Sequence, residues 1–562
     1  MNRPVPAPDS LPEEASGAIL GGANPLLGLS RRQLARATGR FVSASARHTP
    51  TVAGAGVHLA GELAAVAAGR STVAPAPGDR RFADDAFTRN PLYRRAMQGY
   101  LASGAALDGL VDRVGLSGID AVRARFALTL LTEALAPTNS LLGNPGALRR
   151  AKATRGRSLL RGVRNFAGDV AHNGGLPSMV DTRPFIKGVT VAASPGRVVF
   201  RNDVCELIQY APTTPTVHRR PMVIIPPQVN RFWVLDLAPG RSMVEYLAAQ
   251  GQQVFVLVWR NPSPEHRDWS LDTYIAAALE ALDAASDVGR SLELNVVGVC
   301  AGGITTAALM GHLAAVGDRR VASLTLLVTV LDTDMESALT AFLTEPTGAA
   351  AIRHSRRKGV LAGREMARVF AWLRPNDLVW NYWVNNYLLG QEPPAFDVLA
   401  WNSEATNLPA GLHADFITIG LDNAFAQAGT LEVLGTPVDL GKVECDVYAV
   451  AAQTDHITPW PACYRSLRLL GGESRFVLSS SGHIQALVNP PGNPKARYST
   501  NPDLPAEPEA WLAGATPESG TWWTDWAAWL DERGGGRVKT PRTLGSRRHP
   551  ATDPAPGRYV FG

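Results

Sequence analysis

The spacing of hydrophobic residues changes once along the chain, near residue 190. Before that point apolar residues recur at helical spacing, in stretches such as RRQLARATGRFVSASA and ARFALTLLTEAL. After it, short apolar runs rich in β-branched residues alternate with helical stretches; these runs include PMVIIPP, QVFVLVW, LELNVVGVC, VASLTLLVTVL, DVYAVAA and RFVLSSS. Because parallel strands joined by crossover helices produce this alternation, we predict an α/β core behind a mostly helical N-terminal domain.

The rhythm of strands stops in one long internal stretch, where helical and aromatic sequence such as VFAWLRPNDLVWNYWVNNYLLG appears. We interpret this stretch as a cap inserted into the core. The predicted segments are a helical domain over residues 1–190, the core over 191–330 and 441–535, the cap over 331–440, and an irregular tail over 536–562.

Two aromatic clusters allow both a structural and a functional interpretation. The stretch from Phe370 to Tyr387 is expected to pack in the cap's own core; the alternative is that it lines an acyl tunnel or closes the entrance. The tryptophans of TWWTDWAAWLDE are expected to pack against the domain and not to face a polymer or a membrane.

Composition and charge exclude several classes of protein. The 55 Lys and Arg residues and the 50 Asp and Glu residues leave a net charge of only +5, so nucleic-acid binding is not indicated. No apolar run reaches the ~18 residues that span a bilayer, and the first residues do not resemble a signal peptide, so we expect a cytoplasmic protein. The four cysteines are far apart, and we expect no disulfide framework, no metal site and no cofactor.

A candidate nucleophile stands where the strand LELNVVGVC meets the helical stretch ITTAALMGHLAAVG. Gly298, Cys300 and Gly302 fit the nucleophile-elbow pattern G-x-S-x-G, with cysteine in place of serine. The helix N-terminus there favours a thiolate, so we predict Cys300 as the nucleophile. From this pentapeptide alone, a buried structural cysteine in a glycine-rich turn is an equally good interpretation.

Two later strands end just before residues that complete such a site. DVYAVAA leads to Asp455 and RFVLSSS leads to His483, which gives the α/β-hydrolase order of nucleophile, acid and histidine. We predict that His483 is the general base and that Asp455 orients it and stabilises its imidazolium. Taken alone, a histidine such as His483 more often caps the following helix, and an aspartate such as Asp455 is more often a turn residue. His456 is expected to point away and to lie behind the catalytic groups.

An oxyanion hole requires two backbone N–H groups aimed at the developing negative oxygen. Ala301, directly after the nucleophile, supplies the first N–H in this pattern. The second is expected from the loop that follows PMVIIPP, and Val229 is the candidate. An ordinary loop after a core strand remains the alternative for Val229.

The motifs GVCAGG, TDHITPW and SGHIQALVNPPGNPKARY together resemble the polyhydroxyalkanoate synthases. The resemblance continues outside the triad, from about Asn24 to the tail; it includes DRRFADDAFTRNPLYRR, PTNSLLGNP, RNDVCELIQYAPTT, IIPPQVNRFWVLDL, VWRNP and WNYWVNNYLLG. The segments PPQVN, FAWLRPNDLVWNYWVNNYLLG and DHITPW resemble most the class II members, which use medium-chain (R)-3-hydroxyacyl-CoA.

This resemblance implies an acyltransferase that moves an acyl group from CoA to Cys300 and then to the hydroxyl of another unit, so that a polyester grows. It also implies that Asp455 helps His483 to activate that hydroxyl, that the protein forms a homodimer, and that it attaches to polyester granules. Two alternatives are a cysteine-dependent thioesterase or esterase with the same triad, and a non-catalytic protein that coats granules. The intact triad argues against the second.

Overall fold

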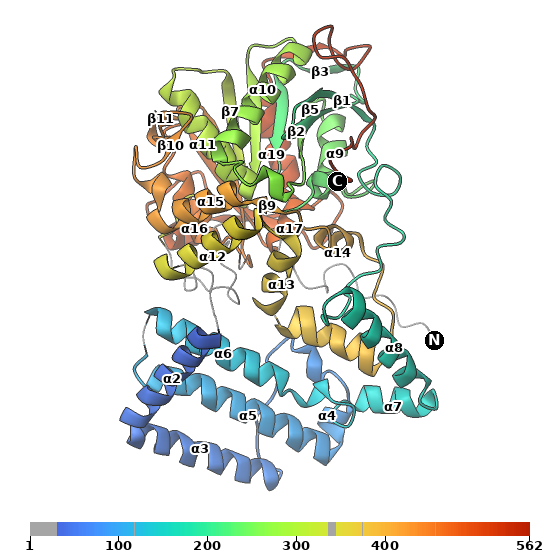
Figure 1. Ribbon diagram of the computed structural model, residues 1–562, viewed down its shortest axis with the longest axis vertical. Coiled ribbons are helices and arrows are strands. Elements are labelled where there is room, and N and C mark those ends of the chain that lie inside the picture. The colour runs from blue at the N-terminus through green and yellow to red at the C-terminus, as the bar shows by residue number, and fades with distance from the viewer. Residues whose placement is uncertain (1–30, 117, 335–343, 374, 456) are drawn as a thin grey trace. The chain divides into compact units, whose positions relative to one another are not determined.

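The computed structural model describes residues 31–562 apart from residues 117, 335–343, 374 and 456, and it divides into two compact units (Figure 1). Among the described residues, one unit contains residues 182–367 and 396–562, and the other contains residues 31–181 and 368–395. We call them the α/β unit and the helical unit. The predicted fold class, an α/β core with a mostly helical N-terminal region, is confirmed.

The α/β unit is built on a mixed ten-stranded sheet in the order β1-β2-β5-β4-β6-β7-β12-β13-β14-β15. Its strands are β1 (Gly196–Arg201), β2 (Cys205–Tyr210), β4 (Pro221–Ile225), β5 (Gln253–Trp259), β6 (Leu294–Val299), β7 (Val321–Leu327), β12 (Asp446–Ala452), β13 (Ser474–Ser479), β14 (Arg497–Thr500) and β15 (Thr516–Ser519). The six strands from β5 to β13 run parallel, and each strand outside them pairs antiparallel with its neighbours. The carboxyl ends of the six parallel strands therefore share one edge of the sheet.

The parallel strands are buried almost throughout, which explains why their sequences are continuous apolar runs and do not alternate. Helices cover the sheet; they are α9 (Met243–Ala249), α10 (Leu271–Gly289), α11 (Ala301–Ala315), α16 (Trp460–Leu467), α17 (His483–Leu487), α18 (Pro508–Ala513) and α19 (Trp522–Glu532). Figure 1 shows α10 and α11 side by side in front of the strands. The continuous apolar strands require a sheet that is covered on both faces, and these crossover helices help to cover it.

The tryptophans of α19 pack against the sheet, as predicted from their spacing. Trp522, Trp523 and Trp526 are at most 1% exposed. The indole of Trp526 donates a hydrogen bond of 3.0 Å to the hydroxyl of Thr325 on β7, and its ring lies 6.5 Å from that of Tyr448 on β12. A polymer- or membrane-facing role for these side chains is therefore wrong.

Between β7 and β12 the α/β unit carries shorter elements over part of the predicted cap. They are α12 (Glu345–Lys358), β8 (Val360–Leu361), α14 (Asp397–Asn402), β9 (Leu408–Pro409), α15 (Ala410–Asp422), β10 (Glu432–Val433), β11 (Thr436–Pro437) and the first residues of α13 (Gly363–Leu373). The contacts group residues 368–395 with the helical unit instead. The segment boundaries drawn from the sequence stay predictions.

The last part of the chain lies along the sheet. β16 (Arg537–Lys539) pairs with β3 (Thr216–His218), and residues 552–555 pair with β1 at the sheet's edge. The N–H of Thr552 donates to the C=O of Val198 over 2.8 Å, and the N–H of Ala555 donates to the C=O of Gly196 over 3.0 Å. The predicted tail is thus mostly irregular in conformation, yet its backbone is held by defined hydrogen bonds.

The helical unit consists of α2 (Arg31–Arg47), α3 (Thr49–Ala67), α4 (Ala86–Arg89), α5 (Pro91–Arg113), α6 (Gly118–Ala134), α7 (Pro145–Ala153), α8 (Arg157–His172) and the π-helical segments η7 (Asn376–Trp380) and η8 (Trp383–Leu388). Side chains cap several of these helices where the sequence places asparagine before proline. Asn90 accepts from the N–H of Leu92, and Asn144 accepts from the N–H of Ala147. Within the described parts of the chain, none of the helices is long and apolar enough to cross a membrane.

The end of the aromatic stretch from Phe370 to Tyr387, residues 383–387, packs with α8, which neither interpretation of the sequence anticipated. Tyr387 donates a hydrogen bond of 2.7 Å to the buried carboxylate of Asp169, and its ring lies 5.3 Å from that of Phe166. The indole of Trp383 donates to the C=O of Asn139 over 3.1 Å. These long-range contacts join residues 376–388 to the helical unit.

Replacement of Trp526 by alanine should destabilise the α/β unit by about 3–5 kcal/mol, because it leaves a large cavity and an unpaired hydroxyl on β7. A shift in the urea-unfolding midpoint measures this loss. Leu292→Ala is the control, since Leu292 is 90% exposed and its truncation should change the midpoint little. Equal midpoints for the two variants would contradict the packing described for α19.

Candidate active site

Cys300 lies directly after β6, where the chain turns sharply into α11. Its φ of 51° and ψ of −111° are values that non-glycine residues seldom adopt, and that a strained nucleophile elbow requires. The N–H of Cys300 donates to the C=O of Leu327, and its C=O accepts from the N–H of Gly303, both over 2.9 Å. The turn thus holds the cysteine at the carboxyl edge of the sheet, where it is buried.

The glycines around Cys300 have no space for a side chain. A Cβ on Gly298 would lie 2.7 Å from the Cα of Gly303, and a Cβ on Gly302 would lie 2.1 Å from the C=O of Ile225 at the end of β4. A Cβ on Gly303 would lie 2.0 Å from the hydroxyl of Thr329. The small residues of the elbow pattern are therefore required by close packing as well as by the turn.

The structure brings the three predicted catalytic side chains together. Asp455 follows β12 and His483 begins α17 after β13, so both loops open at the same sheet edge as Cys300. The Nδ1 of His483 lies 2.6 Å from the Oδ2 of Asp455, and both residues are buried. A further hydrogen bond joins the histidine to the thiol of Cys300. With Nδ1 bound to the carboxylate, the other ring nitrogen is left for the bond to the sulfur.

Thr458 completes the carboxylate's surroundings and was missed in the sequence. Its hydroxyl lies 2.6 Å from the Oδ2 of Asp455 and 3.1 Å from the Nδ1 of His483. The Oδ1 of Asp455 accepts from the N–H groups of Ile457 and Thr458 over 2.8 Å and 3.0 Å. The sequence could have indicated the turn at Asp455, because aspartate side chains often accept from the backbone N–H two residues further on. Nothing in the sequence singled out the hydroxyl of Thr458.

The electrostatics of the pair favour the charged forms of both groups. Burial is the largest influence on His483 and by itself lowers its pKa, but Asp455 and Cys300 attract the proton and raise the pKa above its ordinary value. Burial likewise acts to raise the pKa of Asp455, but the charge of His483 and hydrogen bonds from His483 and Thr458 hold it below the usual value. The imidazolium can therefore persist beside the nucleophile and stabilise a thiolate there.

The other cysteines are in different surroundings. Burial raises the pKa of Cys205, raises that of Cys445 to about 12, and raises that of Cys463 well above its ordinary value. Cys463 is near the site, since its thiol donates to the C=O of Thr458 over 3.5 Å. These three thiols are therefore poor nucleophiles near neutral pH.

The two predicted oxyanion donors lie on elements that contact each other. Ala301 is the first residue of α11, so its N–H has no acceptor within the helix. Residues 228–231, which we call the oxyanion loop, follow β4 and lie beside α11, where the amide of Gln228 donates to the hydroxyl of Thr305 over 2.8 Å. Val229 is buried on this loop. Its role as second donor stays a prediction, and His456 lies outside the described residues.

Two family models match the chain. The model described as the N-terminus of poly-beta-hydroxybutyrate polymerase (PhaC) matches residues 78–247, and the model described as alpha/beta hydrolase fold matches residues 225–490. The second match includes all three predicted catalytic residues.

Curated relatives match almost the whole chain. Poly(3-hydroxyalkanoate) polymerase 1 of Ectopseudomonas oleovorans is 49% identical over 552 residues, which is 98% of each chain. The chain belongs to the poly(3-hydroxyalkanoate) polymerase family. Poly(3-hydroxyalkanoate) polymerase 2 of the same organism is 48% identical over 96% of each chain, and the polymerase subunit of Cupriavidus necator is 41% identical over 88% of this chain and 85% of its own.

Membership of the poly(3-hydroxyalkanoate) polymerase family confirms the resemblance to polyhydroxyalkanoate synthases, which is the same family under another name. It also confirms the predicted enzyme class, an acyltransferase. In this polymerase family member the side chains of Cys300, His483 and Asp455 are linked by hydrogen bonds at one edge of the sheet. The roles of these residues in this chain remain to be proposed from their geometry.

Iodoacetamide should label Cys300 faster than the other three cysteines near neutral pH, because the charged His483 stabilises its thiolate. Since the pKa of His483 is raised, this help is present below that raised pKa and is lost as the pH rises through it. His483→Ala should slow the labelling of Cys300 about tenfold or more, since an unassisted thiol is only a few per cent thiolate near neutral pH. Mass spectrometry of the labelled peptides measures each rate.

The control is His172→Ala, which removes an exposed histidine of the helical unit and should leave the labelling unchanged. Uniform labelling of all four cysteines in the folded wild-type protein would show that the buried pair does not activate Cys300.

Proposed function

We propose that this protein polymerises (R)-3-hydroxyacyl-CoA, of medium chain length, into polyester through a covalent acyl-Cys300 intermediate. The observation that carries the proposal is the buried hydrogen-bonded chain from Cys300 through His483 to Asp455, in a chain that matches polymerases over 98% of its length. The medium-chain class is supported by the wording of PPQVN and DHITPW, which resembles the class II members.

Acylation begins when the thiolate of Cys300 attacks the thioester carbonyl. The negative charge moves to the carbonyl oxygen, where the N–H groups of Ala301 and Val229 stabilise it. The C–S bond to CoA then breaks, and the leaving thiolate takes the proton from the imidazolium of His483. This step conserves the thioester, since one thioester is exchanged for another, and releases one CoA.

Chain growth requires an oxygen nucleophile at the same site. The hydroxyl of a second hydroxyacyl unit gives its proton to His483 as its oxygen attacks the acyl-Cys300 carbonyl. An ester bond forms and the cysteine leaves as the thiolate, beside the imidazolium. Asp455 and Thr458 hold the ring in one orientation throughout, because both contact Nδ1.

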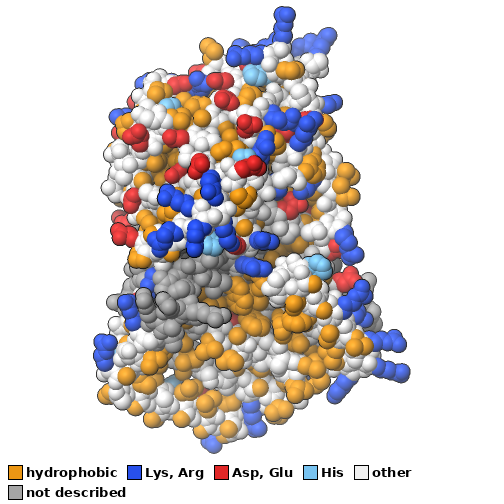
Figure 2. Space-filling view, viewed as in Figure 1, with side chains coloured by type: hydrophobic (Ala, Val, Ile, Leu, Met, Phe, Trp, Pro, Cys, Tyr) orange, Lys and Arg blue, Asp and Glu red, His pale blue; other side chains and the backbone are white. Residues whose placement is uncertain are grey.

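Association with polyester granules is part of the same proposal, and α8 supplies its structural support. Leu160, Val163 and Val170 on this helix are 73%, 66% and 53% exposed. Figure 2 shows that hydrophobic side chains cover much of the surface of the helical unit in this view. Apolar side chains exposed this widely are typical of surfaces that contact an apolar phase. The homodimer is proposed from the family resemblance alone.

Incubation with (R)-3-hydroxyacyl-CoA thioesters of increasing chain length tests the reaction. We expect CoA release with insoluble polyester as the main product, fastest for medium chains, and background CoA release by Cys300→Ala. Chromatography of the products distinguishes a polymerase from a hydrolase, because both begin with the same acyl enzyme. Free hydroxy acid equal to the CoA released, with no polymer, would make the thioesterase the correct function.

Replacement of Leu160 and Val163 by serine should weaken binding to isolated polyester particles about tenfold or more, since each apolar side chain contributes roughly 1.5–3 kcal/mol when buried. Sedimentation with the particles measures the bound fraction, and CoA release from soluble substrate should stay unchanged. The control is Leu292→Ser, which alters an exposed leucine of the α/β unit. Equal sedimentation of both variants and the wild type would remove α8 from the granule surface.

A further inference from the structure

The oxyanion loop is held from two sides by segments that lie far away in the sequence. On one side are residues 401–406: the hydroxyl of Thr406 donates to the C=O of Gln228 over 2.6 Å, and its N–H donates to the C=O of Val229 over 3.0 Å. The indole of Trp401 donates to the C=O of Arg231 over 2.6 Å. These three bonds hold three of the loop's four carbonyls. The C=O of Gln228 shares a peptide plane with the N–H of Val229, so the bond to Gln228 also orients that N–H.

On the other side is the end of the tail, residues 552–562, which we call the tail segment. The guanidinium of Arg231 donates to the C=O of Tyr559 over 2.9 Å and to the C=O of Gly562 over 2.7 Å. Arg231 is only two residues from Val229. The side chain of Arg231 therefore connects the proposed oxyanion donor to backbone about 330 residues further along the chain.

A second connection joins the two sides to each other. The ammonium group of Lys187 lies 2.8 Å from the carboxylate of Glu404 and donates to the C=O of Val560 over 3.4 Å. The same carboxylate accepts from the indole of Trp233, just beyond the oxyanion loop, over 3.2 Å. The loop, residues 401–406 and the tail segment thus form one hydrogen-bonded clamp.

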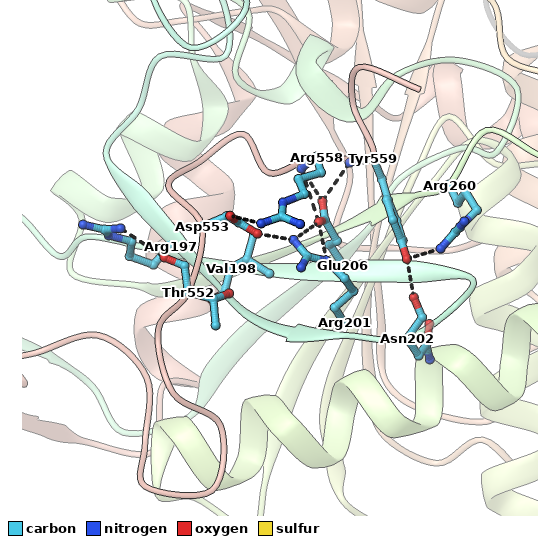
Figure 3. Close-up of polar contacts among 10 residues, drawn as sticks. All are labelled: Arg197, Val198, Arg201, Asn202, Glu206, Arg260, Thr552, Asp553, Arg558 and Tyr559. Carbon is cyan, nitrogen blue, oxygen red and sulfur yellow. Dashed lines mark hydrogen bonds and ion pairs between the residues drawn. The ribbon is translucent and has the colours of Figure 1, made fainter.

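The tail segment is itself anchored at a buried carboxylate (Figure 3). Glu206 on β2 has no exposed surface, and it accepts from the guanidinium of Arg201 and from the N–H groups of Arg558 and Tyr559 over 2.9 Å and 3.0 Å. Gly557 has a φ of 80°, and a Cβ there would lie 2.3 Å from the carboxylate. Only glycine allows the backbone to approach Glu206 so closely.

The ring of Tyr559 secures the segment further. The guanidinium of Arg260 lies 4.4 Å from the ring centroid, and the phenol donates to the C=O of Asn202 over 2.7 Å. Glu206, Arg260 and the pairing with β1 thus hold the tail segment in place. The carbonyls that accept from Arg231 are therefore fixed in position.

We propose that Arg231 is a positioning residue, which uses the tail segment as a fixed support to hold the N–H of Val229 in place for the oxyanion. This inference rests on the proposed function. By this proposal the tail segment helps to place the oxyanion donor through its backbone carbonyls alone. The physical reason is that an oxyanion donor works only within hydrogen-bond distance of the developing charge, and removal of one such donor costs about 10²–10³-fold in kcat.

Two reactions of Cys300 separate this role from a general loss of structure. Release of CoA proceeds through a tetrahedral oxyanion and needs the donor. Alkylation by iodoacetamide is a displacement at saturated carbon that needs the activated thiolate but forms no oxyanion. A displaced oxyanion loop should therefore slow the first reaction and spare the second.

The experiment compares Arg231→Met with Arg197→Met in the full-length protein. The first removes both hydrogen bonds to the tail segment; the second removes the bond from Arg197 to the C=O of Thr552, another tail contact that does not involve the oxyanion loop. For Arg231→Met we expect kcat for CoA release to fall about tenfold or more, since a small misplacement can cost about 10²-fold. KM and the alkylation rate of Cys300 should stay within about twofold, and Arg197→Met should behave as the wild type.

A second variant covers the case in which Arg231→Met fails to fold, which labelling of the buried Cys205 would reveal. Deletion of residues 558–562 removes the acceptors instead of the donor and leaves the pairing of residues 552–555 with β1. It should show the same split between slow CoA release and normal alkylation.

The proposal is overturned if folded Arg231→Met releases CoA within threefold of the wild type, or if CoA release and alkylation fall together. Equal losses in Arg197→Met would also overturn it, because the tail would then act through stability alone. Undiminished CoA release by Cys300→Ala is a different result: it would remove the proposed function, and this inference with it.

Discussion

The parallel centre of the sheet is the constraint on which the candidate site depends. Six neighbouring strands run in one direction, so the loops after β4, β6, β12 and β13 all emerge at one edge. Each loop brings one component: the oxyanion loop, Cys300, Asp455 and His483. Their mutual distances thus depend first on the spacing of about 4.8 Å between strands, and the hydrogen bonds within the loops then hold the side chains in place.

Burial of the charged pair carries an energetic cost that local hydrogen bonds offset. A carboxylate that leaves water loses several kcal/mol of hydration unless its lone pairs find donors. Asp455 finds four, from two backbone N–H groups, the hydroxyl of Thr458 and the ring of His483. The site therefore keeps a charged acid in a buried position, where its influence on the imidazolium is stronger than in water.

The sequence predicted those features that local pattern encodes. Continuous apolar runs identified the parallel strands, and the residues after them identified Cys300, Asp455 and His483, because a strand followed by a tight turn constrains only a few neighbours. Partners far away in the sequence were not predictable. The contact of Tyr387 with Asp169 spans 218 residues, and that of Arg231 with Tyr559 spans 328. Arginine and tyrosine suit many surface positions, so nothing in their own neighbourhoods indicated these contacts.

The pairing of residues 552–555 with β1 has a consequence for the order in which the protein is made. Residues 196–201 of β1 leave the ribosome long before residue 555 is synthesised. The outer edge of β1 therefore has no pairing partner while the rest of the chain is being made. Closure of this edge joins residues more than 350 positions apart, a contact of very high sequence separation that forms late in folding. The hydrogen bonds that cover β1 can consequently form only after this segment has been translated.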